Sequence, residues 1–389
     1  MIPGHRKFLY LLIISFAVTA FARSASAATH YIITNDDVSG QLLINSTSFY
    51  SVSANGGLNL TNSVSTNGTG IGGGYFGASR VTVVHTGSQD CAFISNAASG
   101  SIAGIVLATQ TLSNAFTGSP GDQGTSNGIG LASNHHYLYA SFSDSDTIGT
   151  FKIKSGCTLK FIGDVTVGGL NGGIINGMAV HDDMMVTTYG DGSIESFNIA
   201  GGVPVSDGDL QNSTGYDGAT YPNGVDITSD GRFAIFGDTA TSTVLEVSDI
   251  SSGKLAPTVV YRLGRGISSS NVMLSPDESL LYISNTQGDR VSAAFFDAAS
   301  GVLTKGCSSN RLRGYVDNFS YLGALALQKA SGTGGVLYVA EFGSSSAVAT
   351  IKVNSSDGQC TMKEMAHSPA FDPNSPGLLS IAAFPPRKF

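Results

Sequence analysis

The sequence contains no tryptophan and little charge. Among its 389 residues there are 20 Lys and Arg and 28 Asp and Glu, which give a formal net charge of −8. So few basic residues argue against nucleic acid or an anionic membrane as a partner. The four cysteines never stand at C-x-x-C spacing, and no HExxH motif, Ser-His-Asp pattern or glycine-rich phosphate loop is present. The common zinc, redox and phosphate-loop sites are therefore not indicated.

No segment beyond the N-terminus is apolar and long enough to span a bilayer. Arg6 and Lys7 precede the apolar run Phe8–Ala22, and Ala25-Ser26-Ala27 has the form of an A-x-A cleavage site. The run is short for a membrane span, so we expect a signal peptide over residues 1–27. A retained membrane anchor is the alternative. Cleavage would leave residues 28–389 as a secreted or periplasmic protein without a membrane span.

What the chain does contain is a repeated pair of β-type segments. The first member is a short apolar segment that opens on a small or amide residue, at Tyr75–Val84, Asn127–Ala132, Asn176–Val180, Asn223–Ile227, Ser270–Leu274, Leu322–Leu327 and Gly377–Ala382. The second member is a β-rich run that ends near a turn residue, at Tyr31–Thr34, Cys91–Ser95, Tyr137–Ser141, Met184–Thr188, Arg232–Phe236, Leu280–Ser284 and Val336–Ala340. Regular repetition of short strands is typical of a β-propeller.

One copy of this pair is divided between the two ends of the chain. Gly377–Ala382 has no second-type run after it, and Tyr31–Thr34 has no first-type segment before it. We therefore predict a single all-β domain over residues 28–389, a seven-bladed β-propeller of four-stranded antiparallel blades. A C-terminal strand pairs with three N-terminal strands to close the ring, which leaves no large open sheet edge.

The clearest single unit spans residues 223–260. Asn223–Thr228 is predicted as its innermost strand, Arg232–Phe236 as the second, Thr243–Val247 as the third and Leu255–Val260 as the outermost. The second strands are nearly continuous apolar runs, as expected for strands buried on both faces. The third strands alternate between apolar and polar residues, as half-buried strands do.

Four cysteines in an exported chain predict two disulfides. Cys91 begins a second-type run, and Cys157 falls at the turn between the third and outermost strands one blade later. Cys307 and Cys360 also fall in adjacent blades. We favour the pairs Cys91–Cys157 and Cys307–Cys360. The other two connectivities and four buried free thiols are the alternatives.

Several sequence pieces at the blade turns are distinctive, namely Tyr31–Asp37, Ala92–Gly100, Gly156–Leu159, Ser275–Asn285 and Leu337–Ala340. They resemble the lactonase-type seven-bladed propellers, a family that includes bacterial 6-phosphogluconolactonase and fungal carboxymuconate-cyclising enzymes. The resemblance covers essentially all of residues 28–389. It implies the propeller fold and an activity that hydrolyses or cyclises a small lactone or sugar acid at the central funnel.

One feature of that family is absent. Its active members usually carry a Gly-Pro-Arg-His stretch at the start of an innermost strand, whereas the starts here read Asn127-Gly, Asn176-Gly, Asn223-Gly and Ser270-Asn. We therefore expect no imidazole or guanidinium at these positions to handle a carboxylate or a lactone carbonyl. Because a fold alone does not supply a reaction, the sequence leaves open whether the chain is an enzyme.

Amide side chains recur where the chain enters the innermost strands, at Asn127, Asn176, Asn223 and Asn271. Carboxamides both donate and accept hydrogen bonds, so a ring of them suits a polar neutral ligand such as a sugar or a lactone. In the alternative interpretation each Asn only turns or caps its own backbone.

Acids and amides also recur where the second strands end, at Asp36, Asp37, Asn96, Asp144, Asp146, Asp191, Asp238, Asn285, Asp289 and Glu341. Glu341 is the candidate general base, because it follows Val336–Ala340 directly and could activate water if burial raised its pKa. The alternative is an exposed carboxylate or a salt bridge. Asn285 is a candidate ligand-binding amide. Calcium at the Asp pairs is less favoured than turn formation, so no metal and no cofactor is expected.

The loops add three further candidates. Arg265 lies between glycines before the Asn271 strand and could grip a carboxylate. Tyr216 and Tyr221 lie in the long loop 207–221 and could form a wall against which a ligand stacks. Three histidines are not favoured as catalytic residues, because His181 follows an innermost strand and His135 and His136 fall at a turn on the opposite face.

Six Asn-x-Ser/Thr sequons occur, at Asn45, Asn59, Asn67, Asn212, Asn318 and Asn354. They are potential glycosylation sites in a eukaryotic secretory pathway and incidental in a bacterium.

Two functions remain in competition. The first is an exported lactonase-like hydrolase or cycloisomerase, with Glu341 and Arg265 as catalytic residues and the amides as ligand-binding residues. The second is a non-catalytic extracytoplasmic propeller that binds a ligand or a protein partner. A metal-dependent propeller lyase is a weaker third. We expect a monomer.

Overall fold

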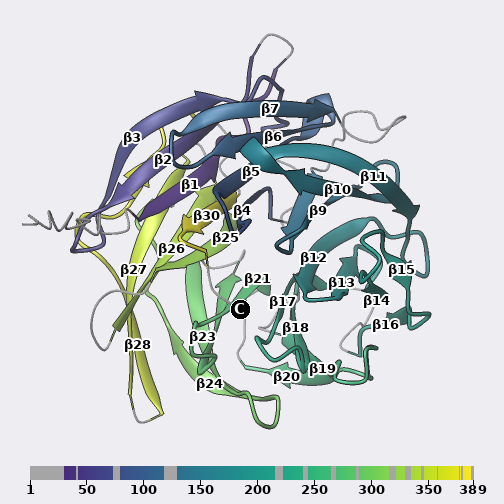
Figure 1. The fold of residues 1–389 in the computed structure, drawn as a ribbon. Helices are drawn as coiled ribbons and strands as arrows, with labels where there is room; N and C mark the ends of the chain where they lie inside the picture. Colours follow the sequence, from purple (N-terminus) through teal and green to yellow (C-terminus); the bar gives the residue numbers. More distant parts are fainter. Residues whose placement is uncertain are drawn as a thin grey trace, which may run out of the picture.

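The computed structural model describes residues 30–386 except 41–42, 73–78, 118–128, 215–221, 240–243, 264–268, 286–288, 315–320, 329–333, 343–345, 357, 376 and 378–379. Seven antiparallel sheets surround a central axis in the manner of propeller blades (Figure 1). The predicted seven-bladed β-propeller is confirmed. No helix within the described residues has the length and apolar character needed to cross a bilayer.

The first four blades contain strands β1 to β16 together with the C-terminal strand β30. Blade 1 consists of β1 (Tyr31–Asn35), β2 (Ser46–Val52), β3 (Leu58–Ser65) and β30 (Ser380–Phe384). Blade 2 consists of β4 (Val81–His85), β5 (Asp90–Asn96), β6 (Ser101–Val106) and β7 (Thr111–Thr117). Blade 3 consists of β8 (Ile129–Ser133), β9 (Tyr137–Phe142), β10 (Thr147–Lys154) and β11 (Thr158–Thr166). Blade 4 consists of β12 (Ile175–His181), β13 (Met184–Tyr189), β14 (Ser193–Asn198), β15 (Val205–Ser206) and β16 (Gln211–Asn212).

Three further blades complete the ring. Blade 5 consists of β17 (Pro222–Ile227), β18 (Phe233–Asp238), β19 (Val244–Asp249) and β20 (Val259–Arg262). Blade 6 consists of β21 (Ser269–Leu274), β22 (Leu280–Asn285), β23 (Arg290–Asp297) and β24 (Val302–Ser308). Blade 7 consists of β25 (Tyr321–Gln328), β26 (Gly334–Phe342), β27 (Ala347–Ser356), β28 (Gln359–Glu364) and β29 (Ala370–Phe371). Two short 3-10 helices, η1 (Ala97–Ser99) and η2 (Ser155–Cys157), lie between strands.

The ring is closed as predicted, because the C-terminal strand β30 joins the N-terminal strands in one sheet. β30 pairs antiparallel with β1 from Tyr31 opposite Phe384 to Asn35 opposite Ser380. β1 then pairs with β2, and β2 with β3. Blade 1 therefore holds the two ends of the described chain together.

The outer parts of the blades differ from the prediction. Blades 4 and 7 carry an additional short strand each, so these two sheets have five strands. The outermost strand of blade 5 was expected at Leu255–Val260 but begins only at Val259. The reason is a turn, in which Ser248 Oγ donates to Ala256 O at 2.7 Å and Leu255 is buried in the apolar cluster shared by blades 4 and 5.

The hydrophobic core is divided into layers between neighbouring blades. In β26, Leu337 and Val339 pack with residues of blade 6, whereas Tyr338 and Ala340 pack with residues of blade 1. This alternation follows from the two-residue period of a strand. The same alternation determines whether a polar residue at the end of a strand faces the preceding or the following blade.

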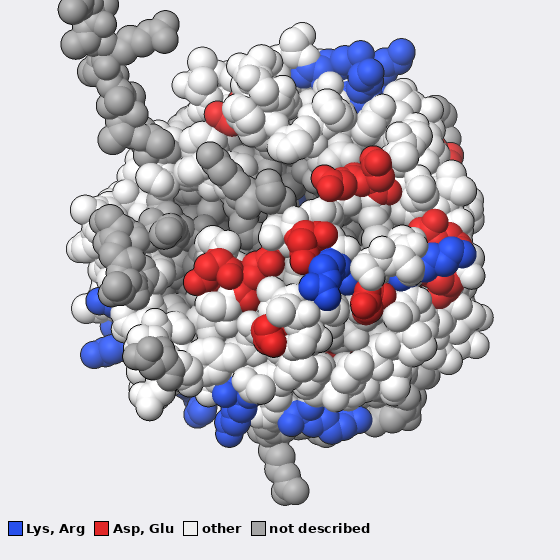
Figure 2. Space-filling model, turned by 60° about the horizontal axis from the view of Figure 1, so that its bottom comes forward, with Lys and Arg blue, Asp and Glu red and all other residues white. Residues whose placement is uncertain are grey.

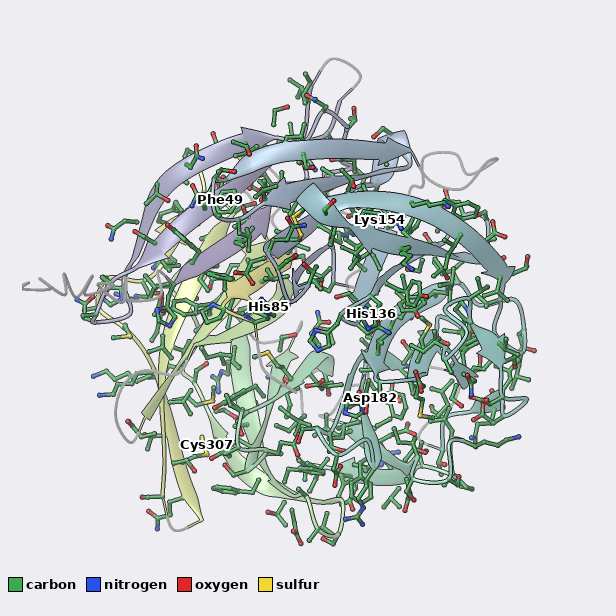
Figure 3. All side chains as sticks on the ribbon, in the orientation of Figure 1. Phe49, His85, His136, Lys154, Asp182 and Cys307 are labelled. Carbon is green, nitrogen blue, oxygen red and sulfur yellow. A yellow bond between two sulfur atoms is a disulfide. The ribbon has the colours of Figure 1, made fainter. Side chains whose placement is uncertain are left out.

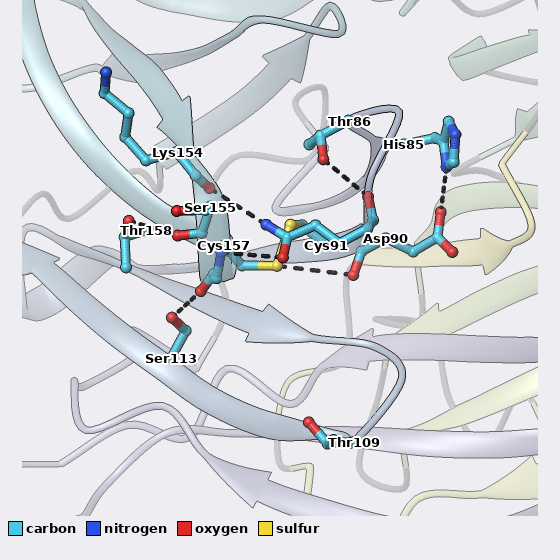
Figure 4. The surroundings of a disulfide bond; sticks show 12 residues. His85, Thr86, Asp90, Cys91, Thr109, Ser113, Lys154, Ser155, Cys157 and Thr158 are labelled. Carbon is cyan, nitrogen blue, oxygen red and sulfur yellow. Dashed lines mark hydrogen bonds and ion pairs between the residues drawn. A yellow bond between two sulfur atoms is a disulfide. The ribbon is translucent and has the colours of Figure 1, made fainter.

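Both favoured disulfides are present. Cys91 of β5 is bonded to Cys157 of η2, with their Cα atoms 5.5 Å apart (Figure 4). Cys307 of β24 is bonded to Cys360 of β28, with a Cα separation of 5.6 Å. Each bond joins two adjacent blades, and two disulfides are compatible with a secreted or periplasmic protein.

Candidate functional site

Five of the seven second strands end in a buried polar residue that faces the preceding blade. The seven equivalent positions, taken around the ring, are Asp36, Asn96, Phe142, Tyr189, Asp238, Asn285 and Glu341, each no more than 2% exposed. In five of these strands, the apolar residues two and four positions before this end lie on the same face of the strand and pack against the preceding blade. We call this end of the ring, where the chain enters the innermost strands, the upper face.

Glu341 stands out among these residues because its carboxyl group lacks a described hydrogen-bond donor. It lies in β26 and is 2% exposed. It is on the same face of the strand as Leu337 and Val339, so it faces blade 6. Neither Oε atom has a hydrogen-bond partner within the described part of the chain. The backbone of Gly314 lies directly over the carboxyl group, since a Cβ on Gly314 would stand 1.8 Å from Oε2.

The electrostatic surroundings hold this carboxyl group in its neutral form near pH 7. Burial, followed by the negative charges of Glu364 and Asp289, raises the pKa of Glu341 from 4.5 to about 8, and Arg313 opposes the shift. Arg313 Nε lies 3.3 Å from Glu364 Oε2. Arg311 Nε lies 3.0 Å from Asp289 Oδ2. A carboxyl group with a pKa in this range can take up or release a proton under physiological conditions.

Asn285 occupies the position in blade 6 that is equivalent to Glu341 in blade 7. Its Nδ2 donates to Arg290 O at 3.0 Å and to Ser292 Oγ at 3.1 Å, which uses both amide hydrogens. Its Oδ1 is buried and has no hydrogen-bond partner among the described residues. The side chain is therefore oriented so that it can only accept a further hydrogen bond.

The amides at the starts of the innermost strands connect one strand to the next. Asn176 Nδ2 donates to Asn223 Oδ1 at 3.2 Å, and Thr188 Oγ1 donates to the Asn223 carbonyl at 2.6 Å. These strands approach so closely that a Cβ on Gly177 would lie 1.9 Å from the Asn223 carbonyl oxygen. Asn176 Oδ1 is buried and has no hydrogen-bond partner among the described residues.

Asn271 lies in β21 on the same side of the ring. Its backbone N–H donates to Ser284 Oγ at 3.0 Å, and its side chain is half-buried. Four other candidates from the sequence lie outside the described residues, namely Asn127, Tyr216, Tyr221 and Arg265.

One buried arginine, Arg80, is not among the residues predicted from the sequence. Arg80 immediately precedes β4 and is 1% exposed, and its Nη1 lies 2.7 Å from Asp37 Oδ2. The signal was present, because Arg80 belongs to the first-type segment 75–84, and a guanidinium at the start of an innermost strand is what the family resemblance implies. Asp37 also accepts a hydrogen bond from the Ile71 N–H at 3.1 Å, so this carboxylate holds both Ile71 and Arg80.

A second carboxyl group of raised pKa lies where blades 7 and 1 meet. Burial and the charge of Asp372 raise the pKa of Asp36 from 3.8 to about 7, although Ser46, Thr34 and Ser48 donate hydrogen bonds to it. Asp36 follows β1 and Asp372 follows β29. This acid pair therefore spans the boundary between blades 7 and 1.

His85, His135, His136 and His181 lie at the opposite end of the ring, where innermost strands turn into second strands. Figure 3 shows His85 and His136, together with Asp182, around the middle of the ring, where innermost strands turn into second strands. His181 Nε2 lies 2.9 Å from the Ser229 carbonyl oxygen of the next blade. These contacts connect neighbouring turns.

Charge is unevenly distributed over the surface. On the face shown in Figure 2, most visible Asp and Glu residues lie across the middle, and most visible Lys and Arg residues lie toward the edge. Within the described residues, no three His, Cys, Asp or Glu side chains are arranged to hold a metal ion.

Comparison with known proteins identifies the fold. No protein-family model matches the chain, and no curated protein matches it. A proposed 6-phosphogluconolactonase from Bacteroides fragilis NCTC 9343 superimposes with a TM-score of 0.67 at 13% identity, over 92% of this chain and 99% of that one. A second, from Bacteroides uniformis ATCC 8492, gives a TM-score of 0.66 at 12% identity, over 91% of this chain and 99% of that one.

A protein of unknown function from Desulfotomaculum acetoxidans DSM 771 has the same architecture. It superimposes with a TM-score of 0.62 at 16% identity, over 91% of this chain and 98% of that one. The lactonase-type propeller fold that the sequence resembles is therefore confirmed. Identities this low show the fold alone.

Proposed function

We propose that this chain is an extracytoplasmic lactonase-like enzyme that opens or closes a small polar lactone at the upper face of the ring. The observation that carries the proposal is Glu341, a carboxyl group with a pKa raised to about 8 and no described hydrogen-bond donor. Leaving such a group buried and unsatisfied costs stability, and groups of this type are characteristic of functional sites.

In the hydrolytic direction, Glu341 acts first as a general base. Its carboxylate takes a proton from water while the water oxygen bonds to the lactone carbonyl carbon. The ring C–O bond then breaks, and Glu341 returns the proton to the leaving oxygen, which yields the hydroxy acid. Proton transfer by a positioned carboxyl group typically contributes about 10²–10⁴-fold to the rate.

The arrangement favours a substrate without a phosphate group. Arg313, the cation that acts on Glu341, already pairs with Glu364, and Arg311 pairs with Asp289. Asn285 offers only an acceptor oxygen, which matches a hydroxyl group of the ligand. We therefore favour a neutral hydroxylated lactone over a phosphorylated sugar acid.

The test is proton release by the purified protein from residue 28 onward, against a panel of sugar lactones, aryl lactones and muconolactone-type acids. Turnover that disappears in Glu341→Gln supports the assignment. Asp164→Asn is the matched control, because it removes one exposed carboxylate from β11 in blade 3, whereas Glu341 lies in blade 7. Turnover that persists unchanged in Glu341→Gln would exclude Glu341 as the catalytic residue.

A non-catalytic propeller is the second candidate. Its support is that the amides of Asn176 and Asn223 bond to each other between neighbouring strands. Asn176 Oδ1 remains as an acceptor that could bind a ligand hydroxyl without any chemical step. A flat response across the whole lactone panel, together with saturable heat of binding for a polyol in calorimetry, would support this second function.

A further inference from the structure

We propose that residues 310–314 form a strap over Glu341 that opens locally, while the ring stays folded, and so gives a ligand access to the carboxyl group. The strap follows β24 of blade 6 and reaches across the boundary to blade 7, where Glu341 lies. The proposal rests on the function proposed for Glu341, because a general base must meet both water and substrate.

In the closed arrangement the strap blocks one side of the carboxyl group. Gly314 is buried directly over it, since a Cβ at this position would stand 1.8 Å from Glu341 Oε2. A water oxygen keeps about 2.7 Å from each oxygen with which it shares a hydrogen bond, so no water fits between Gly314 and Oε2. Glu341 as a whole is 2% exposed. Approach to Oε2 from this side therefore requires Gly314 to move.

The strap begins at a residue that is fixed to blade 6. The Ser309 N–H donates to the Val291 carbonyl at 2.8 Å, and the Val291 N–H donates to Ser309 Oγ at 3.1 Å. Ser309 is itself buried. These two bonds hold Ser309 to β23, so the movement starts after this residue.

Two arginines hold the strap at the surface, one to each blade. Arg311 Nε lies 3.0 Å from Asp289 Oδ2 in blade 6, and Arg313 Nε lies 3.3 Å from Glu364 Oε2 in blade 7. The Arg313 guanidinium also donates to two backbone carbonyls after β28. The two arginine side chains are 59% and 50% exposed. Ion pairs with so much contact with water are weak and are screened by salt, so they can separate without disturbing the core.

Leu312, between the two arginines, is the apolar anchor of the strap. It is buried in the apolar cluster that blades 6 and 7 share, and its N–H donates to the Asp289 carbonyl at 3.0 Å. The Arg313 N–H donates to Glu364 Oε2 at 2.9 Å. Segments held by few apolar contacts and by peripheral hydrogen bonds open at a lower free energy than core strands. The strap can therefore open while β26 remains in its sheet.

The movement also changes the protonation of Glu341. Burial, followed by the charges of Glu364 and Asp289, raises its pKa to about 8, and Arg313 opposes the shift. Burial is the largest of these causes, so readmission of water lowers the pKa. Opening of the strap thus converts a neutral acid into the ionised form that can accept a proton.

The first experiment is hydrogen exchange on the protein from residue 28 onward, followed by peptide mass spectrometry. The amides of the strap should exchange several-fold faster than those of residues 336–340 in β26. In the double variant Arg311→Gln/Arg313→Gln, exchange of the strap should accelerate and that of β26 should not. Equal protection of the two segments, lost together in urea, would overturn the proposal, because the strap would then open only when the ring unfolds.

The second experiment asks whether opening exposes the carboxyl group. Carbodiimide coupling of glycine ethyl ester labels accessible carboxyl groups, and peptide mass spectrometry follows the label at Glu341. Labelling should be slow in the unchanged chain and several-fold faster in Arg311→Gln and in the double variant. Arg262→Gln is the matched control, because it removes an exposed arginine from β20 in blade 5. Equal labelling rates in all four proteins would overturn the strap as the barrier.

Neither measurement uses a lactone, so the strap and the function of Glu341 can fail separately. A strap that opens in a chain without lactone turnover would contradict the proposed function alone. Turnover in a chain whose strap shows core-like protection would contradict the strap alone.

Discussion

Gly314 and Glu341 fit each other across the boundary between blades 6 and 7. A Cβ on Gly314 would stand 1.8 Å from Glu341 Oε2 and 3.2 Å from Pro369 Cγ. The missing side chain at 314 is therefore what leaves room for the carboxyl group. Five predictions follow from this and other contacts.

Gly314→Ala should displace the Glu341 carboxyl group and lower the free energy of unfolding by about 1–3 kcal/mol, the usual cost of overpacking a buried site. Lactone turnover should fall with it. Urea denaturation followed by circular dichroism measures the first effect. Gly201→Ala is the control, because a Cβ there meets nothing within 4 Å, and equal stability of the two variants would contradict the fit.

The stability of the protein should fall as the pH rises from 4.5 toward about 8. The folded-state pKa of Glu341 is raised above its ordinary value, so the folded chain holds this proton more tightly than the unfolded chain does. The stabilisation is complete below pH 4.5 and is lost as the pH rises through the folded pKa of about 8. Glu341→Gln removes this dependence.

Denaturant titrations at several pH values compare the two proteins. The difference in unfolding free energy between Glu341→Gln and the unchanged chain should grow in favour of the variant as the pH increases. A difference that stays constant over this range would mean that the Glu341 pKa is not raised.

The pH profile of turnover should rise through about pH 8, because a general base must be ionised to accept a proton. Glu341→Gln should lose about 10²–10⁴-fold in kcat/KM. Initial rates across the pH range give the profile. A rate that falls over the same interval would instead assign Glu341 as a general acid.

Asp372→Asn should remove the repulsion between the Asp36 and Asp372 carboxylates at the boundary between blades 7 and 1. The charge of Asp372 helps to raise the pKa of Asp36 to about 7, so its removal lowers that pKa. The unchanged chain should lose stability as the pH rises through 7, and the variant should lose less. Melting temperatures on both sides of pH 7 provide the measurement, with Asp164→Asn as the control for loss of a surface charge.

Removal of either disulfide should lower the unfolding free energy by about 4 kcal/mol on the chain-entropy model, because the bonds close segments with sequence separations of 66 and 53 residues. The pairs Cys91→Ala with Cys157→Ala and Cys307→Ala with Cys360→Ala test this separately. Similar losses are expected, since loop length affects the cost only logarithmically. A negligible loss in either pair would show that the unfolded chain is not constrained by that bond.

Much of the ring could be predicted from sequence because its signals are local or repeat. The apolar run Leu280–Ser284 is the strand β22 almost to the residue. The divided pair at Tyr31–Thr34 and Gly377–Ala382 was sufficient to predict β1 next to β30. Cys91 and Cys157 could be matched because the repeat placed them in neighbouring blades.

The site was harder to predict, because its contacts come from distant parts of the chain. The position of Glu341 at a strand end is a local property, but its burial depends on Gly314, and its raised pKa depends on Asp289 and Glu364 in other segments. Likewise the partner of Asn176 is Asn223, one blade later. The repeat places these two amides, 47 residues apart, at equivalent positions in neighbouring blades, but it does not reveal that Asn176 Nδ2 donates to Asn223 Oδ1.

The pairing of β1 with β30 also determines when the ring can close during synthesis of the chain. Among the strands of the ring, β1 is synthesised first and its partner β30, Ser380–Phe384, last. Until then the innermost position of blade 1 is empty and a strand edge is open to other chains. The ring can therefore close only after every other strand has been made, and a partner that covers strand edges would act on the chain before that point.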